Sequence, residues 1–141
     1  MGTRCLTVFQ TYDEEIVVMY RQYDGYVDGH GLELAEFLAG GLMVNGLASG
    51  EERKVFNGME CLSAQVIAHF KDGPGNIYLY PAKTRGYGEN YIYMVKGKIG
   101  KEPTIGIYSV SFSEPPEYTR IAEGTASEIF DRYSNDDETG E

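Results

Sequence analysis

The stretch from residue 19 to residue 31 constrains the fold most, because the hydrophobic period changes within it. Residues 16–23 place side chains alternately on two faces, with the two-residue period of a β-strand. After Gly31 the apolar residues recur at helical spacing, which predicts a helix over residues 32–42. The glycine-rich loop between them contains His30, one of only two histidines. The loop therefore links a strand end to a helix start and carries most of the polar chemistry that the sequence can place.

The other patterns predict an α+β domain. The order of strand-like and helix-like runs shows no regular βαβ alternation, which favours a mostly antiparallel sheet of about five strands with two to three helices packed on one face. The last three main strands are joined by short turns and predict a meander. The expected strands are 5–10, 16–23, 77–80, 91–96, 104–112 and an edge strand over 118–123, the expected helices are 32–42, 59–71 and 126–133, and residues 44–58 are expected to form a long loop.

Length and charge set the domain organisation. A chain of 141 residues fits one domain, and we expect residues 1–133 to form it and residues 134–141 to form an acidic C-terminal tail. Residues 127–141 contain six acidic side chains and one basic side chain, Arg132. This segment therefore carries −5 of the net charge of −10. An acidic surface repels phosphate backbones, so we expect no non-specific binding of nucleic acid.

Several classes of protein are not indicated by the sequence. Cys5 and Cys61 do not lie in a metal-binding spacing, and the first residues lack the apolar run of a signal peptide. No apolar stretch approaches the roughly 18 residues that a membrane span needs. We therefore expect a cytoplasmic protein with no membrane association, no metal site and no cofactor.

Residues 24–31 allow three functional interpretations and one structural interpretation. A calcium loop is the first, because Asp24 and Asp28 have the right spacing, but Tyr26 and Ala35 occupy ligand positions that require oxygen donors. Capture of an anion by free backbone N–H groups at the start of the helix is the second. In the structural interpretation the glycines permit tight turns that lead into the helix.

Catalysis by His30 is the third functional interpretation. Asp24 or Asp28 would orient the imidazole, as in hydrolases and phosphodiesterases. The sequence offers no activated nucleophile beside it, and it contains no G-x-S-x-G signature. We therefore assign no catalytic residue.

Tyrosines dominate the predicted strands and their loops, and cationic residues lie between them. Aromatic rings stack on bases and guanidinium groups pair with phosphate, so this combination suits a nucleotide-like small molecule. Cross-strand packing of tyrosines on a half-exposed sheet is the structural alternative. The residues of this surface are Tyr20, Tyr23, Tyr26, Tyr78, Tyr80, Tyr87, Tyr91, Tyr93 and Tyr108, with Arg21, Lys83 and Arg85 among them.

The first eighty residues resemble a family of small bacterial and phage proteins that has no assigned activity. The resemblance rests on Met1-Gly2-Thr3-Arg4-Cys5-Leu6-Thr7, on residues 19–26 with Gly29-His30-Gly31, and on residues 61–70 with 73–75 and 78–81. It implies a cytoplasmic protein from a phage or other mobile element, and it carries over no functional residue.

The leading hypothesis from the sequence is a non-enzymatic binding protein that captures a small phosphorylated or nucleotide-like ligand, and so sequesters a host signal. An acidic inhibitor of a host protein and a small hydrolase built on His30 are the alternatives. A homo-oligomer formed through the tyrosine-rich face is compatible with the first. The predicted ligand-binding residues are Arg21, Tyr23, Asp24, Tyr26, His30, Arg85 and Tyr87.

Overall fold

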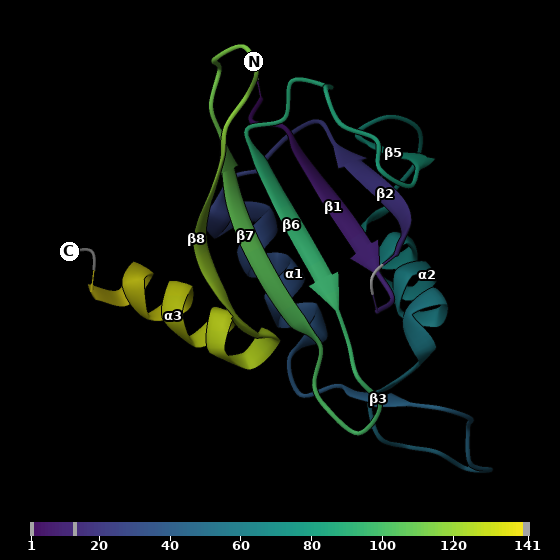
Figure 1. Ribbon diagram of the computed structural model, residues 1–141. Helices are drawn as coiled ribbons and strands as arrows, with labels where there is room; N and C mark the ends of the chain where they lie inside the picture. Colours follow the sequence, from purple (N-terminus) through teal and green to yellow (C-terminus); the bar gives the residue numbers. More distant parts are fainter. Residues whose placement is uncertain (1, 13, 140–141) are drawn as a thin grey trace.

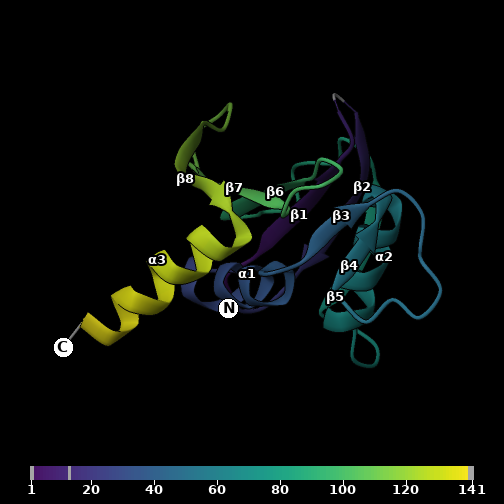
Figure 2. The ribbon, with the colours of Figure 1, turned by 90° about the horizontal axis from the view of Figure 1, so that it is seen from below.

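A six-stranded sheet with all three α-helices on one face forms the body of the protein (Figures 1 and 2). The computed structural model describes residues 2–12 and 14–139. The strand order is β5-β2-β1-β6-β7-β8. The strands of this sheet are β1 (Cys5–Gln10), β2 (Glu15–Arg21), β5 (Ile77–Pro81), β6 (Tyr91–Lys96), β7 (Thr104–Val110) and β8 (Tyr118–Thr125).

The predicted α+β class and the mostly antiparallel sheet are confirmed, with six strands where about five were expected. One central pair differs, because β1 and β6 run parallel. The predicted meander of β5, β6 and β7 is wrong, since β5 pairs with β2 while β6, β7 and β8 form the meander. The reason is that β5 extends the sheet beyond β2, so the chain returns across the sheet to the free side of β1 before β6 begins.

The helices begin close to where the periodicity predicts. They are α1 (Leu32–Leu38), α2 (Gly58–Phe70) and α3 (Ala126–Thr139), and a π-helical turn, η1 (Val27–Gly31), leads directly into α1. The expectation that α1 reaches residue 42 is wrong, because Ala39 is extended and Gly40 has a φ of 78°. The left-handed conformation at a glycine is a common way to end a helix.

Two short features were not predicted. Residues 44–58 were expected to be a loop, but β3 (Leu42–Val44) and β4 (Val55–Asn57) form a two-stranded parallel sheet at its ends.

Helix α3 continues to Thr139, so most of the segment assigned to an acidic tail is helical, and residues 140–141 lie outside the described part of the chain. Within that part no helix has the length and apolarity needed to cross a bilayer.

The sheet has an apolar centre on both faces. On β1, Cys5 and Phe9 face the helices, whereas Leu6 and Val8 face away from them, and all four are fully buried. The side chains that join Leu6 and Val8 on the second face are Val18, Tyr20 and Ile92, with Tyr80, Met94, Tyr108 and Val110 partly buried beside them. In the described part of the chain no helix covers this second face (Figure 2). We call it the open face.

Candidate functional site

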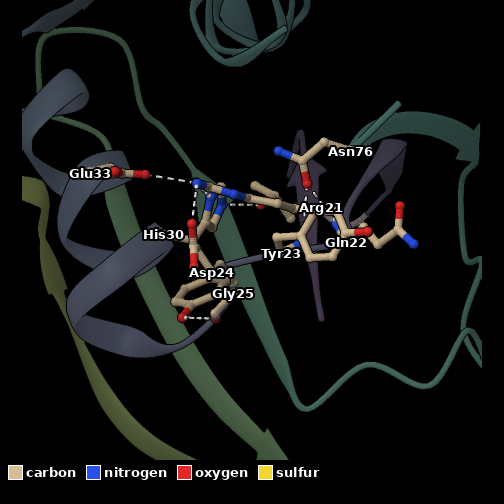
Figure 3. A network of polar contacts seen from close by, with 10 residues as sticks. Arg21, Gln22, Tyr23, Asp24, Gly25, His30, Glu33 and Asn76 are labelled. Carbon is tan, nitrogen blue, oxygen red and sulfur yellow. Dashed lines mark hydrogen bonds and ion pairs between the residues drawn. The ribbon is translucent and has the colours of Figure 1, made fainter. Parts of the chain in front are cut away.

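A partly buried polar cluster forms where β2 meets η1 and α1 (Figure 3). The guanidinium of Arg21 donates through Nη1 to Nδ1 of His30 at 3.1 Å and to Oε1 of Glu33 at 2.7 Å. Its Nη2 lies 3.9 Å from Oδ2 of Asp24. Nε2 of His30 lies 2.7 Å from Oγ1 of Thr7. Arg21, Asp24 and His30, three of the predicted ligand-binding residues, therefore meet.

His30 is neutral in this cluster. Its ring is fully buried, and this desolvation, together with the nearby charge of Arg21, lowers the pKa from 6.5 to about 3. Because an arginine only donates, Nδ1 must accept, so Nε2 carries the proton and donates to Thr7. The ring also packs against Phe70 and Tyr93, with centroid distances of 4.9 Å and 5.1 Å. Both nitrogens are occupied, so His30 has no free atom with which to act on a ligand.

The glycine loop is held by its own backbone. The N–H groups of Gly25, Gly29 and His30 donate to the carbonyl oxygens of Thr3, Tyr26 and Asp24, each at 2.9–3.0 Å. These donors are not available to an anion. The glycines are required by space, since a Cβ at position 25 would lie 2.8 Å from the carbonyl carbon of Arg4. These contacts favour the structural interpretation of the loop over anion capture.

Tyr93 of β6 also stabilises the glycine loop. Its hydroxyl donates to the carbonyl oxygen of Gly25 at 2.7 Å, and burial raises the pKa of the phenol far above its usual range, so it remains a donor. Tyr93→Phe removes this bond without removing the ring. We expect the free energy of unfolding to fall by about 1–2 kcal/mol, because the Gly25 carbonyl loses a buried partner. Urea denaturation measures the change.

Tyr91→Phe is the matched control for that substitution, because Tyr91 lies two residues earlier on the same face of β6 and its hydroxyl has no hydrogen bond within the described residues. It should change stability by less than about 0.5 kcal/mol. Equal losses in Tyr91→Phe and Tyr93→Phe would show that the bond to Gly25 is not what stabilises the loop.

The seven predicted ligand-binding residues do not form one pocket. Arg21 points to the helix side of the sheet, while its neighbour Tyr20 points to the open face. Tyr87 stacks on Tyr80 at 4.3 Å and lies 6.0 Å from Tyr20, so it belongs to the open face, as does Arg85. The sheet therefore separates Arg85 and Tyr87 from the cluster around Arg21 and His30.

Tyr23 and Tyr26 are exposed, at 50% and 43%. The N–H groups of Gln22 and Tyr23 donate to Oδ1 of Asn76, which fixes the backbone after β2 (Figure 3). Tyr26 lines a shallow hollow with Asn90 at the end of the sheet. Neither tyrosine contributes a polar contact to the Arg21 cluster, so the cluster contains three of the seven predicted residues.

The open face has its own hollow of about 370 Å³ over β6 and β7, which we call the tyrosine hollow. Ile92, Met94 and Tyr108 form its floor, since they share the open face of the two strands. Gly106, opposite Met94, contributes no side chain. The residues that line the hollow are Glu15, Lys83, Arg85, Ile92, Met94, Tyr108 and Tyr118.

A β-bulge brings Glu15 to this hollow. The register of β1 and β2 shifts between Phe9 and Gln10, so Glu15 pairs with Gln10 and turns to the open face. Its carboxylate accepts from Nη2 of Arg85 at 2.7 Å and from the N–H of Lys83 at 2.7 Å. Burial raises the pKa of Glu15, but the hydrogen bonds and charges of Arg85 and Lys83 outweigh it and lower the pKa. The ionised Glu15 thus holds the two cationic residues at the rim.

Hydrogen bonds to Glu89 fix the conformation of the loop between β5 and β6. Glu89 is 5% exposed and accepts from the N–H groups of Gly86 and Tyr87, at 3.1 Å and 2.8 Å. These bonds place the Tyr87 ring against Tyr80. A binding surface that is already ordered loses less conformational entropy when it binds.

Sequence reasoning missed the floor of the hollow. Ile92, Met94 and Tyr118 were not among the predicted ligand-binding residues, and Tyr108 and Lys83 were included only in the tyrosine surface. The available signal was that both faces of 91–96 are apolar, since Ile92 and Met94 alternate with Tyr93 and Val95. Such a strand needs a partner on each face, and here no helix covers one of them.

The described residues contain no group of three or more His, Cys, Asp or Glu side chains arranged to hold a metal ion. Comparison with known proteins finds no matching family model, no similar curated protein and no similar solved structure.

Proposed function

We propose that this protein is a non-enzymatic binding protein that holds a small phosphorylated, nucleotide-like ligand in the tyrosine hollow of the open face. The observation that carries the proposal is the combination of an apolar and aromatic floor with a cationic rim in one hollow. A base or similar ring stacks on aromatic side chains, and a phosphate pairs with an ammonium or guanidinium group. In its biological role the protein would sequester a signal molecule.

Charge supports the same choice of ligand. The protein carries a net charge of −10, yet the rim of the hollow has two cations, Lys83 and Arg85, against the single carboxylate of Glu15. Lys83 is exposed at the rim. An anion is therefore repelled by most of the surface and attracted at this position. That contrast favours a small anion that enters the hollow over a long polyanion that must lie across acidic surface.

The Arg21 cluster supports the fold in this proposal and does not bind the ligand. His30 is fully buried and Arg21 is 8% exposed, and their polar atoms contact one another. A hydrolase built on His30 needs the imidazole to reach a substrate. The buried ring favours a binding protein over that alternative.

The test is the affinity for the four ribonucleoside monophosphates, measured by isothermal titration calorimetry. We expect at least one of them to bind, and Tyr118→Ala to weaken it about tenfold or more through loss of the stacking surface. Tyr118 is 47% exposed, so the truncation leaves the core intact. Tyr23→Ala is the matched control, because Tyr23 is 50% exposed and lies outside the hollow, and it should leave the affinity unchanged.

Two outcomes would contradict the proposal. The first is that none of the four nucleotides binds at millimolar concentration. The second is that Tyr23→Ala weakens binding while Tyr118→Ala does not. That result would place the binding site at the loop after β2.

A further inference from the structure

A second hollow continues the open face beyond the tyrosine hollow. It has a volume of about 470 Å³ and lies between the turn after β1 and the turn between β6 and β7. Three of the six lysines of the chain line it, together with three threonines. We call it the lysine hollow, and its lining includes Thr11, Lys96, Lys98, Lys101, Thr104 and Thr125.

The register places the two hollows in line on the same face. Lys96 pairs with Thr104 across β6 and β7, and Thr104 pairs with Thr125 across β7 and β8. Lys96 follows Met94 of the tyrosine hollow by two residues, so both side chains point to the open face. From Ile92 to Lys96 the strand spans about 13 Å at about 3.3 Å per residue.

Gly106 lies between the two hollows on β7. Thr104 lines the lysine hollow and Tyr108 lines the tyrosine hollow, and Gly106 is the residue between them on the same face. A Cβ there would lie 3.4 Å from Cε1 of Tyr108 and 3.9 Å from Cβ of Met94. Because Gly106 has no side chain, no side chain of β7 separates the two hollows at this position.

The charge of the lysine hollow is positive. Its lining has one carboxylate, Glu102, which is already engaged by the hydroxyl of Ser127 at 2.6 Å and by the N–H of Gly40. Burial raises the pKa of Glu102, but these hydrogen bonds outweigh it and lower the pKa, so the carboxylate is ionised. Among the described residues no carboxylate lies within 4.0 Å of an ammonium nitrogen of the three lysines.

We propose that the lysine hollow is the subsite for an oligophosphate chain, so that the ligand of the open face is a nucleoside oligophosphate with its base in the tyrosine hollow. Three ammonium groups and the hydroxyl of Thr104 are suitable donors for several phosphate oxygens. The assignment of the base end rests on the proposed function. The assignment of the phosphate end rests on the lysine hollow alone, and the two are tested with different probes.

Calorimetry with sodium tripolyphosphate tests the phosphate end without a base. The combined Lys96→Gln, Lys98→Gln and Lys101→Gln variant should weaken tripolyphosphate binding at least about tenfold, because three charge-assisted contacts are lost. The control is the combined Arg53→Gln, Lys71→Gln and Arg132→Gln variant, which makes the same change in net charge at exposed side chains outside the hollow. It should change the affinity by no more than about twofold, since distant exposed charges are screened.

The four ribonucleoside triphosphates test the connection between the hollows. At least one should bind about tenfold tighter than tripolyphosphate, because its base adds stacking in the tyrosine hollow. Gly106→Val should abolish this difference and leave tripolyphosphate binding intact, since valine suits a strand but fills the floor between Met94 and Tyr108.

The outcomes separate the two proposals. Equal losses in the lysine variant and its control, or no binding of tripolyphosphate, would overturn the phosphate subsite while leaving monophosphate binding at Tyr118 as the test of the proposed function. A nucleoside triphosphate whose advantage survives Gly106→Val would overturn the continuity of the two hollows.

Discussion

Lowering the pH from 6.5 to 4.5 should reduce the free energy of unfolding by about 2.3 kcal/mol through His30 alone. The pKa of His30 falls from 6.5 to about 3 in the folded protein, because the ring is desolvated and lies beside the charge of Arg21. Below pH 6.5 the unfolded chain binds a proton that the folded protein does not, so stability falls as the pH falls. Well above pH 6.5 the imidazole is neutral in both states and its contribution is fully retained.

Between pH 6.5 and 4.5 the contribution of His30 to the free energy of unfolding is separated from those of the carboxylates. Glu15 and Glu102 also have lowered pKa values, but their contribution is lost only as the pH falls below the ordinary carboxyl value of 4.5. Urea denaturation at several pH values measures the slope, and His30→Gln is the control that cannot gain the proton. If the free energy of unfolding changes with pH to the same extent in His30→Gln, His30 is not the group that causes the change. Nitrogen-15 shifts of the imidazole provide a second readout, which should show the Nε2-protonated neutral ring at pH 5.

Arg21→Met should destabilise the protein by about 2–3 kcal/mol. The substitution removes the donor to Nδ1 of His30 and the partner of Glu33, and it leaves the buried Nδ1 without a hydrogen bond. Breaking a fully buried ion pair costs more, but the Glu33 side chain is 52% exposed, so water replaces part of the lost interaction. Methionine is of similar length to the aliphatic stem of Arg21, but it removes the guanidinium whose Cζ lies 5.5 Å from the centroid of the Phe70 ring.

Arg53→Met is the matched control for Arg21→Met. Arg53 also pairs with a carboxylate, that of Glu51, at 2.6 Å, but its side chain is 63% exposed. The expected change is below about 0.5 kcal/mol. Burial lowers the pKa of His30 most and the charge of Arg21 adds to it, so Arg21→Met should raise the folded-state pKa of His30. Nitrogen-15 shifts of the imidazole, followed against pH, measure this change. A change in stability with no change in that pKa would show that Arg21 and His30 are not coupled electrostatically.

The sequence predicts the elements of this fold better than their arrangement. Residues 5–10, 91–96 and 59–71 have strong period-two or helical patterns, and strands or helices form there. Strand pairing depends on how the connections cross the sheet, and no residue of β5 specifies β2 as its neighbour. The parallel pairing of β1 with β6 follows from that crossing, so local patterns could not predict it.

The candidate sites, like the fold, could be predicted only in part from the sequence. Periodicity places Arg21 at the end of a strand and His30 just before a helix, but the contact between their side chains depends on the conformation of the loop between them. The tyrosine hollow depends on two features that periodicity does not report. One is the bulge that turns Glu15 to the open face, and the other is the missing side chain at Gly106. Only the pairing of strands brings these residues together with Arg85.

The structural cluster around Arg21 and the proposed binding surface lie on opposite faces of the sheet, and methyl NMR distinguishes them. In a titration with the four ribonucleoside triphosphates, the methyl signals of Ile92 and Met94 should shift, because both line the tyrosine hollow. The signals of Leu34 and Leu62 should remain unchanged, because both are fully buried between the helices and the sheet. Shifts confined to the loop around Arg21 and His30, with Ile92 and Met94 unaffected, would contradict the account.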